Sequence, residues 1–330
     1  MIRHSSVILC TLVLFSFGQA SGGVTVMDSG PGAGHWLLLN NRPILLVGDS
    51  VTQGWMETGT NFDHEAYVQA LAKRRIHCLM IWSFIGPAAG DSDSRIGYDS
   101  PDQSPWTKVS ENPLKWDLHS WNETYWQRLR ELAGLCEERE IVLLITVFDG
   151  WTKTRFSTHQ FNQRNGGPLR RNSEFVRLDS PGTEIVSQDF DESWSPEKKN
   201  QWYQERFALK LIDELREFEN IAFEMFNEGE WYDNQQHAAH ERHFAAFFKS
   251  RGEIVFSNVD HIANFSGRDN ANIDVITLHR PRWDNHPGAL VFFKHYRPEF
   301  FKEPVKPVFF SEPVPSFEGG QRSLDTMMRM

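Results

Sequence analysis

The chain has 330 residues, of which 40% are apolar, so it can bury the core of one large domain. This composition excludes a disordered chain. The net charge of −10 at pH 7 makes nucleic acid a poor partner, because nucleic-acid-binding surfaces are basic.

The first twenty residues have the pattern of a secretory signal peptide. Arg3 and His4 give a short basic start, residues 7–17 form an apolar run, and Gly18-Gln19-Ala20 has the small residues of a cleavage site. The run is too short to span a bilayer, and no later segment is long enough. We therefore expect a signal peptide over 1–20 and a single domain over 21–330. The mature protein should be secreted or periplasmic, with no membrane association after removal of the leader.

The sequence next predicts a hairpin and a regular alternation of strands and helices. The hairpin covers residues 36–47, turns at Asn40-Asn41, and leads into Gly48-Asp49-Ser50. Its second arm, 43–47, is the first of seven predicted strands; the others cover 77–83, 141–147, 221–226, 253–257, 275–278 and 305–310. The predicted helices cover 63–74, 123–139, 197–218, 235–249 and 289–300.

This alternation predicts a parallel sheet with right-handed crossovers. Seven repeats exceed what most open sheets use, so we prefer a (β/α)8 TIM-type barrel over a doubly wound sheet. Too few residues follow the seventh strand for another βα unit of roughly 30 residues. The predicted barrel therefore lacks its eighth strand and last helix, and the domain is incomplete at its C-terminus.

Two predicted connections are long, over residues 85–121 and 150–194, and both follow strands. Long βα loops at the carboxyl end of a barrel are where substrate clefts are built. Several of the twelve tryptophans, including Trp151 and Trp231, lie in segments of this kind. Indole faces stack well on sugar rings, while packing within loops or core is the competing interpretation.

Two apolar strands end in carboxylic acids. Residues 221–226 lead into Asn227-Glu228, and residues 307–310 lead into Ser311-Glu312. A retaining glycosidase needs two carboxyl groups about 5 Å apart, one as acid and one as nucleophile. For one acid alone, the favoured interpretation is that Glu228 caps the following turn or that Glu312 is a surface acid. Together, at strand ends and beside Asn227, they favour a catalytic pair.

These segments resemble a known group of enzymes. Residues 221–228 are similar to the fourth strand of clan A retaining glycoside hydrolases, particularly cellulase-like family 5, and residues 306–312 to the seventh. Residues 39–50 resemble the opening hairpin and first strand of apiosidase-like barrels with a DUF4038-type domain. The likeness covers most of residues 36–315 and rests mainly on the order of the strands, because Asn-Glu alone is a weak motif.

The resemblance implies roles for four residues. Glu228 matches the acid/base, Glu312 the nucleophile, Asn227 the contact to the sugar 2-hydroxyl, and His279 the sixth-strand histidine. The sixth strand departs from the pattern, since Arg280 follows where the family commonly has an aromatic shortly after the histidine. His279 either orients Glu312 or binds a sugar hydroxyl, or it is a histidine at the rim whose hydrogen bonds are made within the protein. Further candidates for sugar contacts are Asp49, Trp82, Asp149, Trp151 and Trp231.

The cysteines and histidines indicate neither a metal nor a cofactor. Cys78 and Cys136 remain after the leader, and secreted domains that depend on bridges carry more cysteines, so free thiols are favoured. His237, His240 and His243 stand three residues apart, unlike the zinc-protease spacing, which favours a solvated helix face.

The sequence thus predicts a secreted retaining glycoside hydrolase that acts on a carbohydrate substrate and needs no cofactor. A carbohydrate-binding barrel without catalysis is the alternative. A metal-dependent hydrolase is third, because paired histidines at strand ends are lacking. The sugar, the linkage and the oligomeric state are left open.

Overall fold

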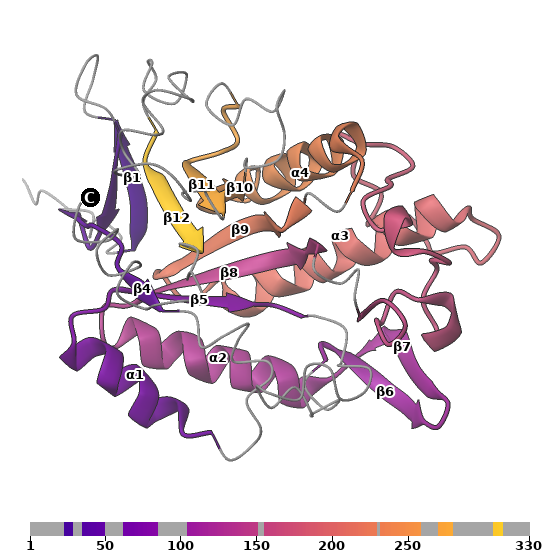
Figure 1. The fold of residues 1–330 in the computed structure, drawn as a ribbon, viewed down its shortest axis with the longest axis horizontal. Helices are drawn as coiled ribbons and strands as arrows, with labels where there is room; N and C mark the ends of the chain where they lie inside the picture. The colour runs from indigo at the N-terminus through magenta and orange to yellow at the C-terminus, as the bar shows by residue number, and fades with distance from the viewer. Residues whose placement is uncertain are drawn as a thin grey trace, which may run out of the picture.

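The described part of the chain is built on a parallel sheet of seven strands (Figure 1). The computed structural model describes residues 23–28, 35–49, 62–84, 104–150, 155–229, 232–258, 270–279 and 306–312. In chain order the sheet strands are β4 (Gly48–Asp49), β5 (Cys78–Trp82), β8 (Val142–Asp149), β9 (Ile221–Asn227), β10 (Val255–Asn258), β11 (Val275–His279) and β12 (Val308–Glu312).

The spatial order of these strands follows the chain order, and neighbouring strands are parallel. This is the order of a (β/α) barrel, and the described strands form a partial one. Glu228 follows the fourth strand and Glu312 ends the seventh, as predicted. The predicted leader, the helix over 289–300 and the predicted incompleteness after Glu312 concern residues outside the described ranges.

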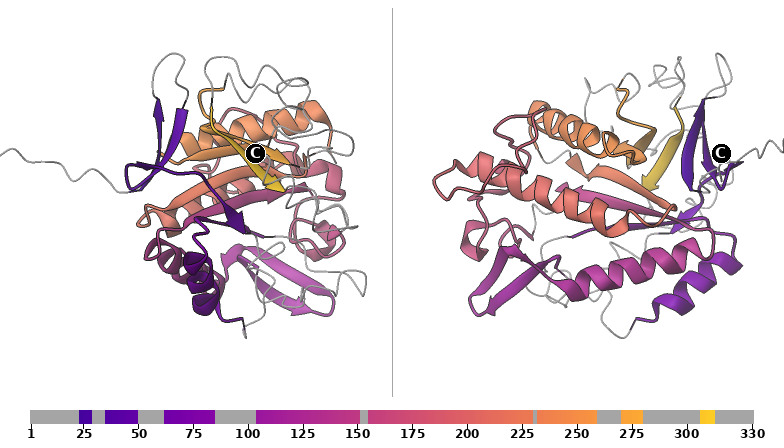
Figure 2. Two further views of the ribbon diagram at one scale, coloured as in Figure 1. Left: turned by 60° about the vertical axis from the view of Figure 1, so that its left-hand side comes forward. Right: turned by 180° about the vertical axis from the view of Figure 1, so that it is seen from behind.

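The α-helices of the described ranges cover the outer face of the sheet, as the views in Figures 1 and 2 show. They are α1 (His64–Lys73), α2 (Glu123–Glu137), α3 (Pro196–Leu215) and α4 (Asn234–Lys249). α3 begins one residue before the predicted 197: Ser195 caps it by accepting a hydrogen bond from the Lys198 amide, and Pro196 occupies the first helical position. Apart from the first predicted strand, the strand and helix predictions within the described ranges are confirmed to within a few residues at each end.

The strands alternate between two cores. Leu143, Ile145 and Phe223 pack toward the helices, while Leu144 and Ala222 belong to the inner cluster of the barrel. Every residue of β8 is buried, as expected of a strand that is covered on both faces.

An N-terminal antiparallel sheet packs against the inner cluster. It consists of β1 (Val24–Asp28), β2 (His35–Leu39) and β3 (Arg42–Pro43). Asn40 and Asn41 adopt φ angles of 51° and 59°, so the predicted turn is confirmed, since asparagine tolerates this left-handed region. The prediction that 43–47 form one strand is wrong, because the chain leaves the hairpin after Pro43 and joins the barrel only at Gly48.

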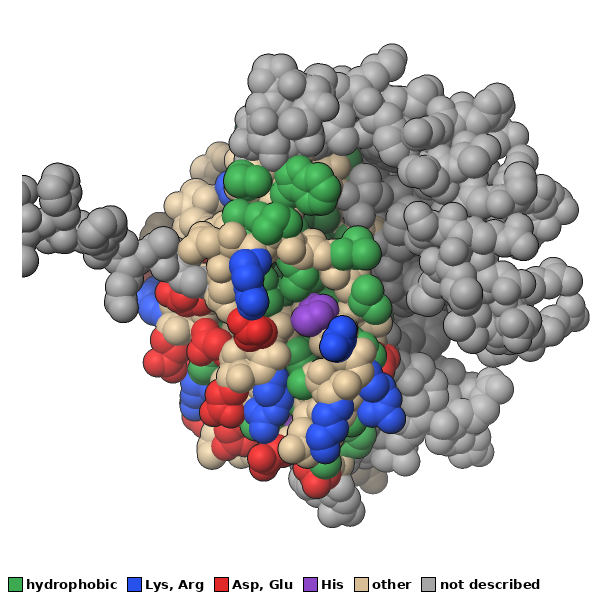
Figure 3. All heavy atoms as spheres, turned by 90° about the vertical axis from the view of Figure 1, so that its left-hand side faces the viewer, with side chains coloured by type: hydrophobic (Ala, Val, Ile, Leu, Met, Phe, Trp, Pro, Cys, Tyr) green, Lys and Arg blue, Asp and Glu red, His purple; other side chains and the backbone are tan. Residues whose placement is uncertain are grey.

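This hairpin buries one face and exposes the other. Val24, Leu37 and Leu39 pack in the inner cluster, whereas the cross-strand pair Met27 and Trp36 is 42% and 51% exposed. Hydrophobic side chains gather on the face that these first strands occupy (Figure 3).

The connection predicted over 85–121 contains a second hairpin, formed by β6 (Trp106–Glu111) and β7 (Leu114–Trp121). This hairpin was not predicted from the sequence. The signal was present, because Leu114, Trp116 and Leu118 alternate with polar residues, which is the period of a half-buried strand.

The histidines of α4 are not on a solvated face. His237, His240 and His243 are 1%, 0% and 4% exposed, so that prediction is wrong. Their partners come from α3: His240 Nε2 lies 2.6 Å from Gln204 Oε1, and His243 Nε2 lies 3.0 Å from Glu205 Oε1.

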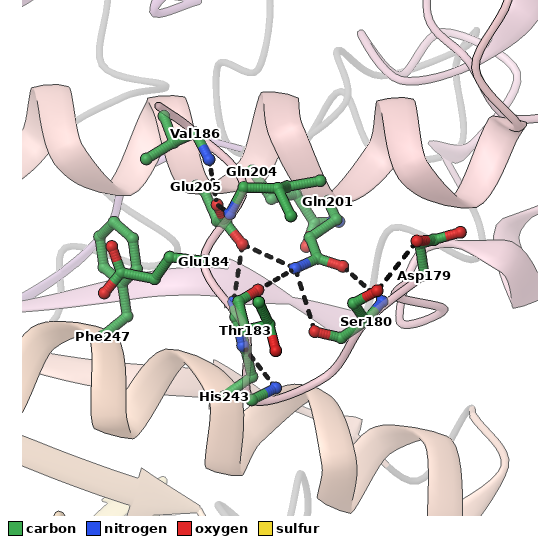
Figure 4. A network of polar contacts seen from close by, with 12 residues as sticks. Asp179, Ser180, Thr183, Glu184, Val186, Gln201, Gln204, Glu205, His243 and Phe247 are labelled. Carbon is green, nitrogen blue, oxygen red and sulfur yellow. Dashed lines mark hydrogen bonds and ion pairs between the residues drawn. The ribbon is translucent and has the colours of Figure 1, made fainter. Parts of the chain in front are cut away.

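Side chains of α3 and α4 also hydrogen-bond to the long connection after β8 (Figure 4). Glu205 accepts hydrogen bonds from the Ile185 and Val186 amides at 2.7 Å, and Gln201 accepts one from the Ser180 amide at 2.9 Å. His243 Nδ1 accepts from the Gly182 amide at 3.0 Å. The three histidines lie on one helix, as predicted. Their side chains pack inward because α3 supplies polar partners for them.

Cys78 and Cys136 are both buried and free, which confirms the expectation of free thiols. Burial raises the pKa of both thiols above the ordinary value, which for Cys136 means about 12. Neither thiol is therefore activated as a nucleophile.

We expect the protein to lose stability in mild acid because of its buried histidines. Burial lowers the pKa of His159 to about 3 and that of His240 well below its usual value. The unfolded chain binds these protons below pH 6.5 and the folded chain does not, so the free energy of unfolding falls as the pH drops through this range. Between pH 7 and pH 5 each histidine should cost about 2 kcal/mol.

Urea unfolding at pH 7, 6 and 5 measures this loss. The variant His159→Phe should lose the contribution of that histidine, about 2 kcal/mol between pH 7 and pH 5, because the new side chain does not titrate. Its ring neighbours Phe161 and Phe175 are aromatic. Phe156→Leu, at a ring neighbour of His159 that does not titrate, is the control and should keep the wild-type slope. An unchanged slope in His159→Phe would contradict the assignment.

Candidate active site

Most of the predicted site residues meet at one edge of the sheet. Parallel strands present their carboxyl ends at the same edge, and in barrels this edge carries the active site. The predicted residues that end strands there are Asp49, Trp82, Asp149, Asn227, His279 and Glu312, with Glu228 directly after Asn227. Asn258, which ends β10 at the same edge, was not predicted. Trp151 and Trp231 lie outside the described residues.

Asp149 and Asn227 form the best-defined contact at this edge. They are register partners on β8 and β9, and Asn227 Nδ2 donates to Asp149 Oδ1 at 2.9 Å. Each side chain is 3% exposed. Asn227 Oδ1 makes no hydrogen bond within the described part of the chain. The amide is therefore held by one end, and its buried acceptor atom is available to a ligand hydroxyl.

Glu228 occupies an unusual backbone conformation. Its φ of 49° lies in the left-handed region, which costs a residue with a side chain about 1–2 kcal/mol, and its side chain is buried at 3% exposure. Strain of this kind concentrates at functional sites because surrounding contacts hold the residue in place. This backbone conformation favours a functional role for Glu228 over that of an ordinary turn cap.

Two glycines allow this conformation. A Cβ on Gly150 would lie 2.0 Å from the Glu228 carbonyl oxygen, and a Cβ on Gly229 would lie 1.7 Å from Cε1 of His237. The end of β8 thus touches the backbone of Glu228 from one side, and α4 supports the following residue from the other. His237 in turn lies 3.5 Å from Glu241, which accepts a hydrogen bond from Ser257 at 2.5 Å.

We expect Gly150→Ala to displace Glu228. The added methyl group cannot fit against the carbonyl oxygen, so the backbone must move, and overpacking of this kind costs about 1–3 kcal/mol of stability. A shift of about 1 Å in a catalytic group costs about 100-fold in rate. Thermal unfolding and kcat/KM on an active substrate measure the two effects.

Gly134→Ala is the matched control for this prediction. Gly134 lies within α2, where a new Cβ would meet only Phe218 at an ordinary 3.6 Å. Alanine is the better helix former by about 1 kcal/mol, so this variant should be slightly more stable and fully active. Normal activity in Gly150→Ala would show that the contact does not position Glu228.

The sixth and seventh strands place His279 beside Glu312. The two residues are register partners on β11 and β12, after a shift in register between Leu278 and His279. Their side chains lie outside what the structure describes, so the predicted 5 Å separation of the Glu228 and Glu312 carboxyl groups stays a prediction. Along the sheet, β9 and β12 are three strand spacings apart, about 14 Å, and the curl of a barrel shortens the distance between their ends.

Asp49 and Trp82 differ in their surroundings. Asp49 is exposed and close to α1, where burial and the Asp49 carboxyl raise the pKa of Tyr67. Trp82 is 2% exposed, packs in the inner cluster, and pairs with Thr146, three residues before the end of β8. Its position below the rim favours the packing interpretation over a sugar contact.

Among the described residues, no group of three or more histidine, cysteine or acidic side chains is arranged to hold a metal ion. The described helices also include none long and apolar enough to cross a membrane.

The strand-end residues were predicted from the sequence except for Asn258, and two supporting contacts were missed. The Gly150 contact and the role of His237 depend on approaches between separate elements. The only local signal was a glycine directly after each of two strand-end acids, Asp149 and Glu228.

Comparisons with known proteins bear on the fold. A scan against protein-family models finds no match, and a search of the curated proteins finds none. Among solved structures, the chain is similar to a Bacteroides vulgatus protein described as a candidate glycoside hydrolase, with a TM-score of 0.58 and 11% identity over 88% of this chain and 47% of that one. The chain thus spans about half the length of that protein.

Two mannanases match over most of their length. The endo-1,4-β-mannanase of Rhizomucor miehei gives a TM-score of 0.55 at 13% identity, over 86% of this chain and 80% of the enzyme. The β-mannanase of the blue mussel Mytilus edulis gives 0.53 at 14% identity, over 88% and 82%. Sequence identities this low show similarity of fold only. The described chain has the partial (β/α) barrel fold of these glycoside hydrolase structures, as the resemblance to clan A barrels implied.

Proposed function

We propose that the protein is a glycoside hydrolase that cleaves a β-linked polysaccharide or oligosaccharide with retention. The observation that carries this proposal is the placement of Asn227-Glu228 and Glu312 at the same edge of a barrel sheet, after its fourth and seventh strands. The fold shared with glycoside hydrolase structures supports it.

In the proposed reaction, the Glu312 carboxylate attacks the anomeric carbon while Glu228 protonates the leaving oxygen. A glycosyl ester on Glu312 results. Glu228, now ionised, takes a proton from water, which attacks the same carbon and releases the sugar with its original configuration. Asn227 contacts the 2-hydroxyl, where hydrogen bonds strengthen in the transition state. No metal or cofactor takes part in this scheme.

The substrate class is proposed from the site and the comparisons. Two carboxylates at a barrel rim suit a neutral sugar chain, and β-1,4-mannan is the first to test because two similar structures are mannanases. The N-terminal leader pattern fits export, which would bring the enzyme to polysaccharides outside the cell.

The test is hydrolysis of β-mannan, cellulose and xylan by the mature chain, with and without EDTA. We expect reducing ends to appear on at least one polysaccharide, unchanged by EDTA, with the β-anomer as the first product by NMR. The double variant Glu228→Gln/Glu312→Gln is the control for contaminating activity. Binding without hydrolysis would identify a carbohydrate-binding barrel, and inhibition by EDTA would indicate a metal-dependent enzyme.

A further inference from the structure

We propose that Asp149 is a positioning residue that fixes the amide of Asn227 for the sugar 2-hydroxyl. This inference rests on the proposed function. It assigns Asp149 a role that acts through Asn227, in place of the direct sugar contact expected from its position at a strand end.

The geometry of the strand ends carries the first step. β8 and β9 pair in register from Leu143 and Ile221 up to Asp149 and Asn227, so both side chains stand on rigid backbone. The 2.9 Å hydrogen bond between them lies where both side chains are 3% exposed, and water competes little for it.

The chemistry of the amide carries the second step. An asparagine side chain presents a donor on one end and an acceptor on the other, and a half-turn about χ2 exchanges them. A carboxylate only accepts, so Asp149 selects the orientation in which Nδ2 faces it. Oδ1 then keeps its capacity to accept, since it has no hydrogen bond in the described part of the chain. A hydroxyl that donates to this atom meets a fixed partner rather than a rotating one.

Neighbouring contacts connect Asp149 to Glu228 as well as to Asn227. Gly150, the next residue after Asp149, lies against the Glu228 carbonyl, and Glu228 follows Asn227. The end of β8 therefore positions both members of the Asn-Glu pair, the amide through a side chain and the acid through the backbone.

The experiment compares Asp149→Leu with Asp149→Asn on two probes. The first is the 2,4-dinitrophenyl β-mannobioside, and the second is its analogue without the 2-hydroxyl on the reacting ring. Leucine fills the space without an acceptor, so we expect kcat/KM to fall about 100-fold on the first probe and less than 5-fold on the second. Asparagine can accept from Asn227 but can also donate to it, so it selects the orientation less strictly. Asp149→Asn should therefore fall between wild type and Asp149→Leu on the first probe and stay within 5-fold of wild type on the second.

A double variant separates positioning from general damage. In an Asn227→Ala background, Asp149→Leu should cause no further loss, because the residue through which it acts is gone. Equal losses on the two probes, or an additional loss in the double variant, would overturn the proposal and indicate a structural role.

A readout without catalysis keeps this inference distinct from the proposed function. In wild-type protein one side-chain amide proton of Asn227 should exchange slowly by ¹⁵N NMR, and Asp149→Leu should make it exchange at least tenfold faster. If the wild-type enzyme turns over neither probe nor any polysaccharide, the proposed function fails. Unchanged amide exchange in Asp149→Leu would overturn the positioning role whether or not the protein is active.

Discussion

Replacing Glu312 with glutamine should reduce turnover about 10⁴-fold or more, which corresponds to roughly 5.5 kcal/mol in the barrier. The amide is a poor nucleophile and cannot form the glycosyl ester, so the first chemical step is lost. The fold should persist, because Glu312 ends β12 at the rim rather than within the core. Reducing-end release and thermal unfolding of Glu312→Gln measure the two outcomes.

Glu219→Gln is the matched control, since Glu219 is exposed and lies before β9 at the opposite edge of the sheet. It should remain fully active. A sharper test of the role uses Glu312→Ala with azide, a small anion that fits the space of the lost carboxyl group. Direct attack by azide should give a glycosyl azide of inverted configuration. Near-normal activity in Glu312→Gln would remove this residue from the mechanism.

Replacing Glu228 with alanine should slow cleavage of the polysaccharide by about 10³–10⁴-fold, the upper range for a lost general acid. The same variant should keep kcat/KM within about tenfold on a dinitrophenyl glycoside, because that leaving group departs without a proton. Azide should now intercept the glycosyl ester on Glu312 and give a product of retained configuration. The two glutamates are thereby distinguished by the stereochemistry of the azide product.

The backbone of Glu228 supplies a control for misfolding. Asparagine tolerates the left-handed region better than alanine does, so Glu228→Asn should be at least as stable as Glu228→Ala and equally inactive on polysaccharide. Equal losses on the two substrate types in both variants would contradict an acid/base role.

Local sequence patterns were enough to predict most of the strands and helices. The apolar run of β8 and the amphipathic run of α3 have distinct periods, and Ser195-Pro196 marks the start of that helix. Alternation of such elements implies a parallel sheet, and a parallel sheet brings the residues after β9 and at the end of β12 to one edge. The candidate acids therefore followed from strand boundaries alone.

Contacts between residues far apart in the chain could not be predicted from these patterns. His240 is buried because it shares a hydrogen bond with Gln204 on another helix. No sequence pattern within α4 predicts that partner. Asn227 is oriented by Asp149, 78 residues earlier in the chain. The left-handed Glu228 is tolerated because Gly150 leaves room for its carbonyl oxygen. Periodicity encodes which face of an element is apolar, but hydrogen-bond partners and close backbone approaches arise only when separate elements pack together.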